Sequence, residues 1–375
     1  MKNSGLALTL VVGCALVLAV TGCDRNATAA TTARETVTDE TALTTVSTNT
    51  AGATAAPNTW TNLNPTTGAE GGPVARANSS MVYDSASGRV ILFGGMDSGG
   101  IFLNDTWAYE PIANTWADLE PSGSLPATRA LHSMVYDSAS DKVILFGGMD
   151  NGGKFQSDTW AYDPIANTWT NLNPSGNRPV ARTNSSMVYD PDSGKVILFG
   201  GMDVAFLMLG DTWVYDPTAN SWAELTPTGS SPTARAGHAM VYEPGNGKVI
   251  LFGGKTDTGF LNDTWAYDPA ANSWTELNPS GTPPSARAFD SLAYDPSSHK
   301  AILFGGQDGS AVLRDTWDYD PTANAWTNLH PAGNLPSARG RYAMVYGLGS
   351  GGVILFGGYD ASPCANDTWA YGPGH

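Results

Sequence analysis

The sequence predicts an all-β fold, a six-bladed β-propeller in which each blade is a sheet of four antiparallel strands. The first observation is a repeat: the run Val-Ile-Leu-Phe-Gly-Gly, with Ala for Val in one copy, recurs six times at intervals of 52 or 53 residues. A period near 50 residues is typical of propeller blades or of a solenoid. The second is composition, because 43 Gly, 24 Pro and 12 Trp with only 14% charged residues favour short strands joined by tight turns.

Four strand patterns follow one another in each unit, as the first unit shows. Residues 80–84 (SMVYD) and 89–95 (RVILFGG) flank a short turn, and residues 105–110 (DTWAYE) and 114–119 (NTWADL) flank a second one. The 89–95 segment is apolar without alternation, as expected for a strand covered on both faces by neighbouring blades. The other two connections are longer and should leave the same face of the ring, because strand direction alternates. We call this end the loop face.

The two ends of the repeat region predict how the ring closes. The sixth unit stops after Tyr371 and lacks a fourth strand, whereas residues 58–63 (NTWTNL) have the pattern of a fourth strand without the other three. We therefore expect the segment around Trp60 to pair beside the segment around Trp369, which would complete the last blade and cover its open edge. The propeller is predicted to cover residues 58–373.

The repeat resembles the kelch-repeat family. Each unit has four apolar residues, Gly-Gly, and then a Tyr and a Trp separated by six residues, as in Tyr109 and Trp116. The resemblance covers residues 58 to about 371, and the architecture is similar to the central domain of galactose oxidase. It implies a closed six-bladed propeller with the first strand of each blade innermost, and it implies no particular reaction.

Residues 1–22 are predicted to be a signal peptide, in which Lys2 precedes an apolar run from Leu6 to Val20 that is shorter than a spanning helix needs. The ending Val-Thr-Gly-Cys resembles the bacterial lipobox, which implies a lipid on Cys23; an ordinary secretory signal with an incidental cysteine is the alternative. Residues 23–57, rich in Thr and Ala, predict a disordered tether. We therefore expect an extracytoplasmic protein of the bacterial envelope, held at the membrane by its lipid alone.

The formal net charge of −16 disfavours nucleic acid as a partner, because a phosphate backbone would be repelled over most of the surface. The sequence contains no phosphate loop, His-x-x-x-His pair or serine nucleophile elbow. Galactose oxidase holds copper with two His and two Tyr, one of them linked to a Cys, and His132, His238 and Cys364 are too dispersed to reproduce that set. We expect a monomer with no cofactor and no metal.

Positions at which the repeats differ are candidates for ligand contacts on the loop face, since loops on a rigid scaffold often carry function. Residues two and three positions beyond each repeat Arg are expected to line the mouth of the central channel, where polar and aromatic groups could hold a sugar or a peptide side chain. Solvated rim residues or contacts to channel water are the alternative. The predicted contacts are Asn78, His132, Asn184, His238, Phe289, Asp290, Arg341 and Tyr342.

An arginine begins every unit. In the kelch family an equivalent arginine can point into the channel and contact an acidic ligand. Strict repetition instead favours a structural pairing with the Asp of Asp-Thr-Trp or with loop carbonyls. The six are Arg76, Arg129, Arg182, Arg235, Arg287 and Arg339.

Two further loop features have open interpretations. The Asp that follows each Gly-Gly pair, such as Asp97, is expected to cap a turn, with Ca²⁺ binding as the alternative. Residues 204–209 (VAFLML) give the third unit an apolar loop, which either contacts a partner or folds back over its blade.

These observations favour a binding module for a protein or glycan ligand over an enzyme, because propellers host many functions and most kelch members bind partners. One alternative is a sugar-processing enzyme resembling bacterial sialic acid mutarotases, for which Arg341, His238, Asp290 and Tyr342 could supply a carboxylate contact and an acid or base. The other is a structural envelope protein without a specific ligand.

Overall fold

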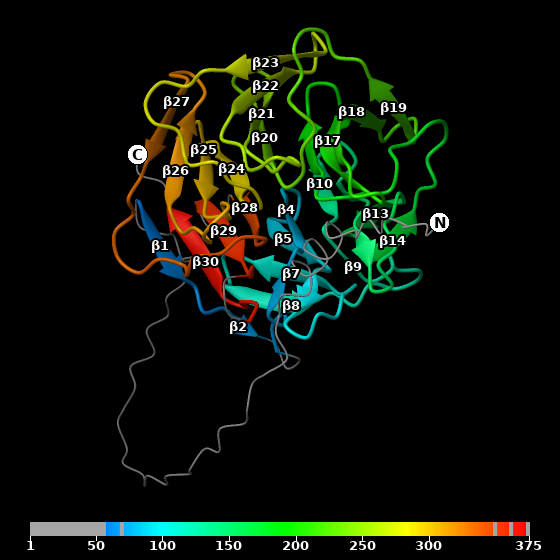
Figure 1. Cartoon of the computed structure of the whole chain (residues 1–375). Coiled ribbons are helices and arrows are strands. Elements are labelled where there is room, and N and C mark those ends of the chain that lie inside the picture. Colours follow the sequence, from blue (N-terminus) through cyan, green and yellow to red (C-terminus); the bar gives the residue numbers. More distant parts are fainter. Residues whose placement is uncertain (1–57, 68–70, 348–350, 360–362, 373–375) are drawn as a thin grey trace, which may run out of the picture.

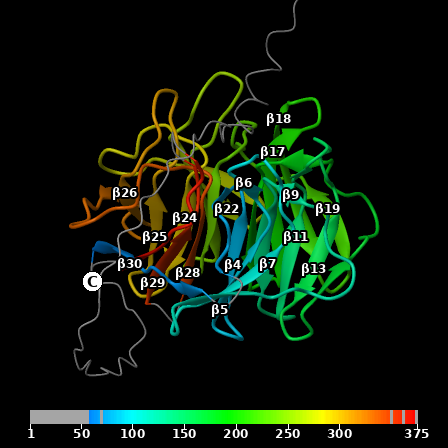
Figure 2. The same ribbon diagram turned by 90° about the horizontal axis from the view of Figure 1, so that it is seen from below.

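The computed structural model describes residues 58–67, 71–347, 351–359 and 363–372, and its only helices or strands in these ranges are β-strands. Figure 1 shows the sheets arranged radially around a common centre, and Figure 2 shows their strands running between the two ends of the ring. The predicted signal peptide (1–22), the tether (23–57) and Cys23 lie outside the described residues. In the described ranges there is no helix with the length and apolar character to cross a bilayer.

Each of the six blades has four main strands in antiparallel order, which confirms the predicted fold class. The innermost strands contact one another in a closed ring; they are β4 (Ser80–Asp84), β10 (Ser133–Asp137), β16 (Ser186–Asp190), β20 (Ala239–Glu243), β24 (Ser291–Asp295) and β28 (Ala343–Gly347). The second strands are β5 (Arg89–Phe93), β11 (Lys142–Phe146), β17 (Lys195–Asp203), β21 (Lys248–Phe252), β25 (Lys300–Phe304) and β29 (Gly352–Phe356). The third are β7 (Thr106–Glu110), β13 (Thr159–Asp163), β18 (Met208–Asp216), β22 (Thr264–Asp268), β26 (Thr316–Asp320) and β30 (Thr368–Gly372). The outermost are β8 (Thr115–Asp118), β14 (Thr168–Asn171), β19 (Ser221–Leu225), β23 (Ser273–Leu277), β27 (Ala325–Asn328) and β1 (Thr59–Asn62).

Short strands join neighbouring loops on the loop face. In the first two blades β3 (Arg76–Ala77) pairs with β6 (Met96–Asp97), and β9 (Arg129–Ala130) pairs with β12 (Met149–Asp150). In the third blade β15 (Arg182–Thr183) pairs with the extended end of β17. At the outer edge of the first blade β2 (Thr66–Thr67) runs parallel to β8.

The apolar core lies between neighbouring blades. Between the first two, for example, Phe93 packs against Leu145 and Trp160 of the next blade. Six such clusters occur, each joining two adjacent sheets. An outer series of hydrogen bonds adds to this packing, because the Trp of each outermost strand donates its Nε1–H to a Thr of the preceding blade at 2.9–3.1 Å. Each blade is therefore fixed by both of its neighbours.

The predicted closure of the ring is confirmed. Strand β1 forms the outer edge of the sixth blade, antiparallel to β30, with Trp60 opposite Tyr371. Trp60 is buried, and its Nε1–H donates to Thr316 of the fifth blade at 2.9 Å. Asn58 accepts a hydrogen bond from the Tyr371 hydroxyl at 2.9 Å. The amino-terminal strand thus takes the same contacts that the outermost strand takes in the other five blades.

Candidate functional site

The six repeat arginines brace the loops at the top of their own blades. Arg129 is fully buried, and its two terminal nitrogens donate to the two carboxylate oxygens of Asp158 at 2.7 Å each. The same guanidinium donates to the carbonyls of Gly147 at 2.9 Å and Ala127 at 3.1 Å. This geometry recurs for Arg76, Arg182, Arg235, Arg287 and Arg339. None of the six lines the two cavities described below.

The carboxylate partner is held in its charged form. Burial alone acts to raise the pKa of Asp158, but the hydrogen bonds and charge of Arg129 outweigh it, with help from the Nε1–H of Trp160 at 2.7 Å. The pKa of Asp158 therefore lies below its usual value. Paired, parallel hydrogen bonds of this kind are among the strongest between side chains.

The double glycine links each arginine to the preceding blade. The N–H of Gly95 donates to the Arg129 carbonyl at 2.9 Å. Gly94 has a φ of 60°, and a Cβ atom on it would lie 2.7 Å from that carbonyl oxygen, so a side chain cannot be accommodated there. Both glycines leave the regular strand conformation, and β5 ends at Phe93 and not at residue 95 as the sequence run predicts. In the third blade β17 continues through the equivalent glycines, with a shift of register between Phe199 and Gly201.

A ring of six residues, which we call the collar, surrounds the channel below the loop face. Its members all have φ between 54° and 64°, and each N–H donates to the carbonyl of the collar residue in the preceding blade at 2.7–3.0 Å. A left-handed conformation costs a residue with a Cβ roughly 1–2 kcal/mol, so the closed hydrogen-bond ring is what maintains it. The collar consists of Asn78, Leu131, Asn184, Gly237, Phe289 and Arg341.

Two collar side chains pack on one another. The Phe289 ring covers Gly237, where a Cβ atom would lie 2.7 Å from the ring carbons. The guanidinium of Arg341 stacks over Phe289 at 4.0 Å from the ring centroid. Its described side-chain hydrogen bond is to Asn78 Oδ1 at 3.4 Å. Burial lowers the pKa of Arg341 to about 10, so the group stays charged at neutral pH.

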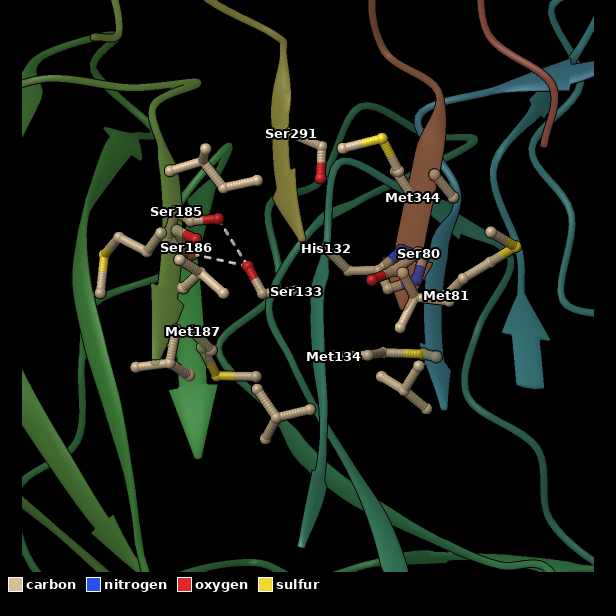
Figure 3. Close-up of a pocket in the computed structure, with 18 of the residues that line it drawn as sticks. Ser80, Met81, His132, Ser133, Met134, Ser185, Ser186, Met187, Ser291 and Met344 are labelled. Atoms are coloured by element: carbon tan, nitrogen blue, oxygen red, sulfur yellow. Dashed lines mark hydrogen bonds between the residues drawn. The ribbon is translucent and has the colours of Figure 1, made fainter. Parts of the chain in front are cut away.

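The central channel forms a cavity of about 440 Å³ beneath and between the collar residues. Its wall includes Ser and Met side chains of the innermost strands (Figure 3), together with Val and Tyr residues of the same strands. All eight ligand contacts predicted from the sequence line this cavity, but they occupy two levels. The upper level is the collar, which contains Asn78, Asn184, Phe289 and Arg341. The lower level contains residues that directly follow collar positions in the chain and form the first part of the channel wall: His132, His238, Asp290 and Tyr342.

The second set packs partly between blades. His132, the residue before β10, reaches toward Ser80 on β4 (Figure 3), and its ring lies 5.5 Å from that of Phe93. His238 makes the same contact with Phe199 at 5.4 Å. Tyr342 takes the equivalent place in the sixth blade, where its hydroxyl donates to the Phe304 carbonyl. The two histidines thus act as buried rings in separate blades and do not converge on one point.

Burial controls the protonation of the two histidines and of Asp290. It lowers the pKa of His132 and His238 to about 3, with the charges of Arg129 and Arg235 acting in the same direction, and the nearby Phe93 carbonyl opposes part of the shift for His132. Burial raises the pKa of Asp290 to about 7. Both imidazoles are neutral at pH 7. Their ring nitrogens and the Asp290 carboxylate have no hydrogen-bond partner within the part of the chain that the structure describes.

A second cavity, of about 270 Å³, lies above the collar on the loop face. Asn184, Phe289 and Arg341 contribute to it from the collar. Its remaining wall is strongly apolar and comes mostly from the first three blades, through Met96, Phe102, Met149, Phe155, Met202, Phe206 and Met208. We call this cavity the Met/Phe pocket. The predicted site contained only its floor.

Sequence comparison among the repeats holds a signal for this pocket. The residue after Gly-Gly is Met in the first three units and then Lys255, Gln307 and Tyr359 in the last three. This position follows the second strand, whereas the predicted contacts were counted from the repeat Arg. The apolar wall was therefore missed.

The apolar loop of the third blade contacts the second blade, and the expected partner contact stays a prediction. It forms the tip of a hairpin between β17 and β18. Phe206 lines the pocket and meets the Phe155 ring edge-on at 6.0 Å. Val204 and Leu207 are 63% and 58% exposed. One side chain thus folds over the neighbouring blade while two remain accessible to a partner.

The Asp after Gly-Gly caps a turn in the first, second, third and fifth blades. Asp97 Oδ1 accepts the N–H groups of Gly99 at 2.8 Å and Ile101 at 2.9 Å, and Asp150 repeats the pattern. Across the described ranges there is no group of three His, Cys, Asp or Glu side chains placed to hold a metal ion.

Comparison with known proteins supports the assignment of the repeat. A family model described as the KLHDC2/KLHL20/DRC7 Kelch-repeats domain matches residues 43–243 and 220–374. The chain is 29% identical over 212 residues to the Rab9 effector protein with kelch motifs of Xenopus laevis (55% of this chain, 57% of that protein). It is 26% identical over 238 residues to the host cell factor homolog hcf-1 of Caenorhabditis elegans (58% and 30%), and 25% identical over 315 residues to Mei4-dependent protein 6 of Schizosaccharomyces pombe (76% and 45%). The matches span between about a third and just over half the length of these relatives. The chain belongs to the kelch-repeat family.

Proposed function

We propose that this kelch propeller is a non-catalytic module that binds a protein partner through its loop face, and that the lipid on Cys23 holds it at a membrane outside the cytoplasm. The observation that carries the first part is the uneven distribution of apolar side chains between the two faces. One relative is named an effector of Rab9, which agrees with a role in protein contacts.

Apolar exposure is concentrated on one half of the loop face. Nine large hydrophobic side chains are exposed in the described ranges. Seven of them lie in loops that lead into or belong to the first three blades: Val74, Ile101, Leu125, Val180, Val204, Phe206 and Leu207. Exposed apolar residues gathered beside a pocket are typical of an interaction surface. The other two, Ile112 and Ile165, lie in tight turns at the opposite end.

Charges introduced on the loop face should abolish partner binding without unfolding the protein. In the double variant Val204→Asp/Leu207→Asp, two exposed side chains next to the Met/Phe pocket become charged, which places unpaired charges in the interface. We expect cross-linking in intact cells to lose the partners seen with the wild type, while the midpoint of thermal unfolding stays within about 2 °C.

The matched control is Ile112→Asp/Ile165→Asp, which makes the same chemical change at side chains 71% and 87% exposed on the opposite end. It should keep the wild-type cross-links. Equal loss in both variants, or loss in neither, would contradict a binding role for the loop face, and glycan-array binding with no protein cross-link would assign the face to a sugar ligand instead.

The membrane anchor makes a separate prediction. Cys23→Ser removes the sulfur that would carry the lipid, so the protein should move from the membrane fraction to the soluble fraction. Fractionation followed by immunoblotting measures this shift, and Cys14→Ser, inside the predicted signal peptide, is the control that should leave the distribution unchanged. Continued membrane retention of Cys23→Ser would rule out the lipid anchor.

A further inference from the structure

The Met/Phe pocket has the size of a site for one anchoring group. Its volume of about 270 Å³ lies just under the roughly 300–1,000 Å³ of typical small-molecule sites. Four Met and three Phe form its wall. Methionine is unbranched and flexible, so such a wall can adapt to Leu, Met or aromatic side chains of different shape.

Two positively charged side chains, Arg341 and Lys255, line this apolar pocket together with one carboxylate, Asp150. The Asp150 carboxylate is already engaged, because it accepts the N–H groups of Gly152 and Lys154 and the side-chain amide of Gln156. Neither Arg341 nor Lys255 makes an ion pair with a described carboxylate within 4.0 Å, although the chain carries 35 Asp and Glu against 19 Lys and Arg. The six repeat arginines are buried and paired, whereas Arg341 is partly buried and has no counter-ion among the described residues. A guanidinium in this position favours an anionic ligand.

The collar holds this guanidinium in place. Arg341 has a φ of 61°, its N–H donates to the Phe289 carbonyl at 2.9 Å, and its carbonyl accepts from Asn78 at 2.7 Å. Stacking on Phe289 fixes the side chain as well. At the same position the other five blades carry uncharged residues. The ring therefore presents one fixed positive group at one side of an apolar pocket, which reduces the ordering cost of binding.

From these observations we infer that the Met/Phe pocket recognises a short acidic peptide segment of the partner, in which a large apolar side chain fills the pocket and a nearby Asp or Glu pairs with Arg341. This inference rests on the proposed function. A protein segment fits better than a free fatty acid, because Ile101, Val204 and Leu207 extend the apolar surface beyond the pocket and would stay uncovered by a small molecule.

The probe is a set of fluorescein-labelled nonapeptides of Ser and Gly, with blocked termini, that carry Leu, Met or Phe at the centre and a single Glu at each other position in turn. Fluorescence polarisation measures the affinity of each peptide for a form of the protein that begins after Cys23, the predicted site of the lipid. We expect the tightest peptides to have Glu close to the anchor, and replacement of Glu by Gln, or of the anchor by Ser, to weaken them about tenfold or more.

Arg341→Gln should weaken the Glu peptide about tenfold and leave its Gln twin within about twofold, because in a double-mutant cycle only the paired charges are coupled. Arg178→Gln is the matched control: it removes the same charge from an exposed loop residue that does not line the pocket, and it should change affinity less than about twofold. If Arg341→Gln unfolds, Phe206→Ser provides the second variant, since Phe206 is 42% exposed and forms pocket wall. It should weaken every anchored peptide.

Equal affinity for the Glu and Gln peptides would overturn the inference, as would direct binding of decanoate, measured by calorimetry, together with no binding of any of the peptides. Either result leaves the proposed function standing as long as loop-face cross-links are still lost in Val204→Asp/Leu207→Asp. If the cross-links persist in Val204→Asp/Leu207→Asp as they do in the control Ile112→Asp/Ile165→Asp, the proposed function itself is wrong.

Discussion

Deleting residues 58–63 should destabilise the propeller by more than about 5 kcal/mol and convert its single cooperative unfolding into a broad transition. The deletion removes β1 and leaves the edge of β30 unpaired. It also removes Trp60, which is 4% exposed, packs on Phe304 and Tyr371 and donates to Thr316. Removing a buried Trp side chain alone costs about 3–5 kcal/mol, which is a large part of the 5–15 kcal/mol of a typical folded protein.

Denaturant unfolding followed by tryptophan fluorescence measures this loss. The control deletes an equal number of tether residues, 46–51, which should leave the midpoint unchanged. Trp60→Ala provides an intermediate step, because it keeps the strand but removes its buried ring. A deletion of residues 58–63 with the stability of the wild type would mean that the ring does not depend on its amino-terminal strand.

Arg129→Met should cost about 3–5 kcal/mol, because it leaves the carboxylate of Asp158 and two loop carbonyls without the guanidinium that pairs with them. The control in the same blade is Lys142→Met. Lys142 pairs with Asp163 at the same 2.7 Å, but its side chain is 38% exposed where that of Arg129 is 0% exposed. An exposed pair contributes about 1 kcal/mol or less, so the comparison separates a buried guanidinium with four hydrogen bonds from an exposed ammonium with one.

The pH dependence of the free energy of unfolding provides a second test of the Arg129–Asp158 pair. The native pKa of Asp158 lies below its unfolded value, so the pair stabilises the fold above about pH 3.9 and this contribution is lost as the pH falls through the native pKa. The free energy of unfolding of Arg129→Met should therefore depend less on pH in this range than that of the wild type. Equal destabilisation by Arg129→Met and Lys142→Met would show that the buried pair does not brace the loops.

The blade architecture and its closure were predictable because the chain repeats one pattern with few changes. The spacing of Gly-Gly and Asp-Thr-Trp fixes six equal units, and the position of the Trp60 segment outside them leaves one place for it. Strand ends were less accurate. The run ending at Gly95 reads as one strand, but β5 ends at Phe93, where two glycines of positive φ break the regular ladder; only in the third blade does the strand resume beyond them.

The candidate site was only partly predictable. Variation among the repeats identified the collar positions, yet the closed hydrogen-bond ring through their backbones could not be inferred from side chains as different as Leu131 and Arg341. The same count placed His132 and Asp290 at the channel mouth, whereas in the structure they follow the collar as the first residues of the channel wall. The pocket above the collar depends on loops from three blades meeting in space, and no single repeat displays it.

Amide hydrogen exchange on the intact protein tests most directly whether the chain is one closed ring. Strand β1 shares a four-residue antiparallel ladder with β30, and Leu63 at its end donates its N–H to the Thr368 carbonyl at 2.9 Å. Because the bonds of an antiparallel ladder alternate, the N–H of Thr61 also points toward β30. The amides of Thr61 and Leu63 should therefore exchange as slowly as those of β30, through the same global opening. Rapid exchange throughout β1 beside a protected β30 would contradict this account, because the sixth blade would then hold together without the strand proposed to close it.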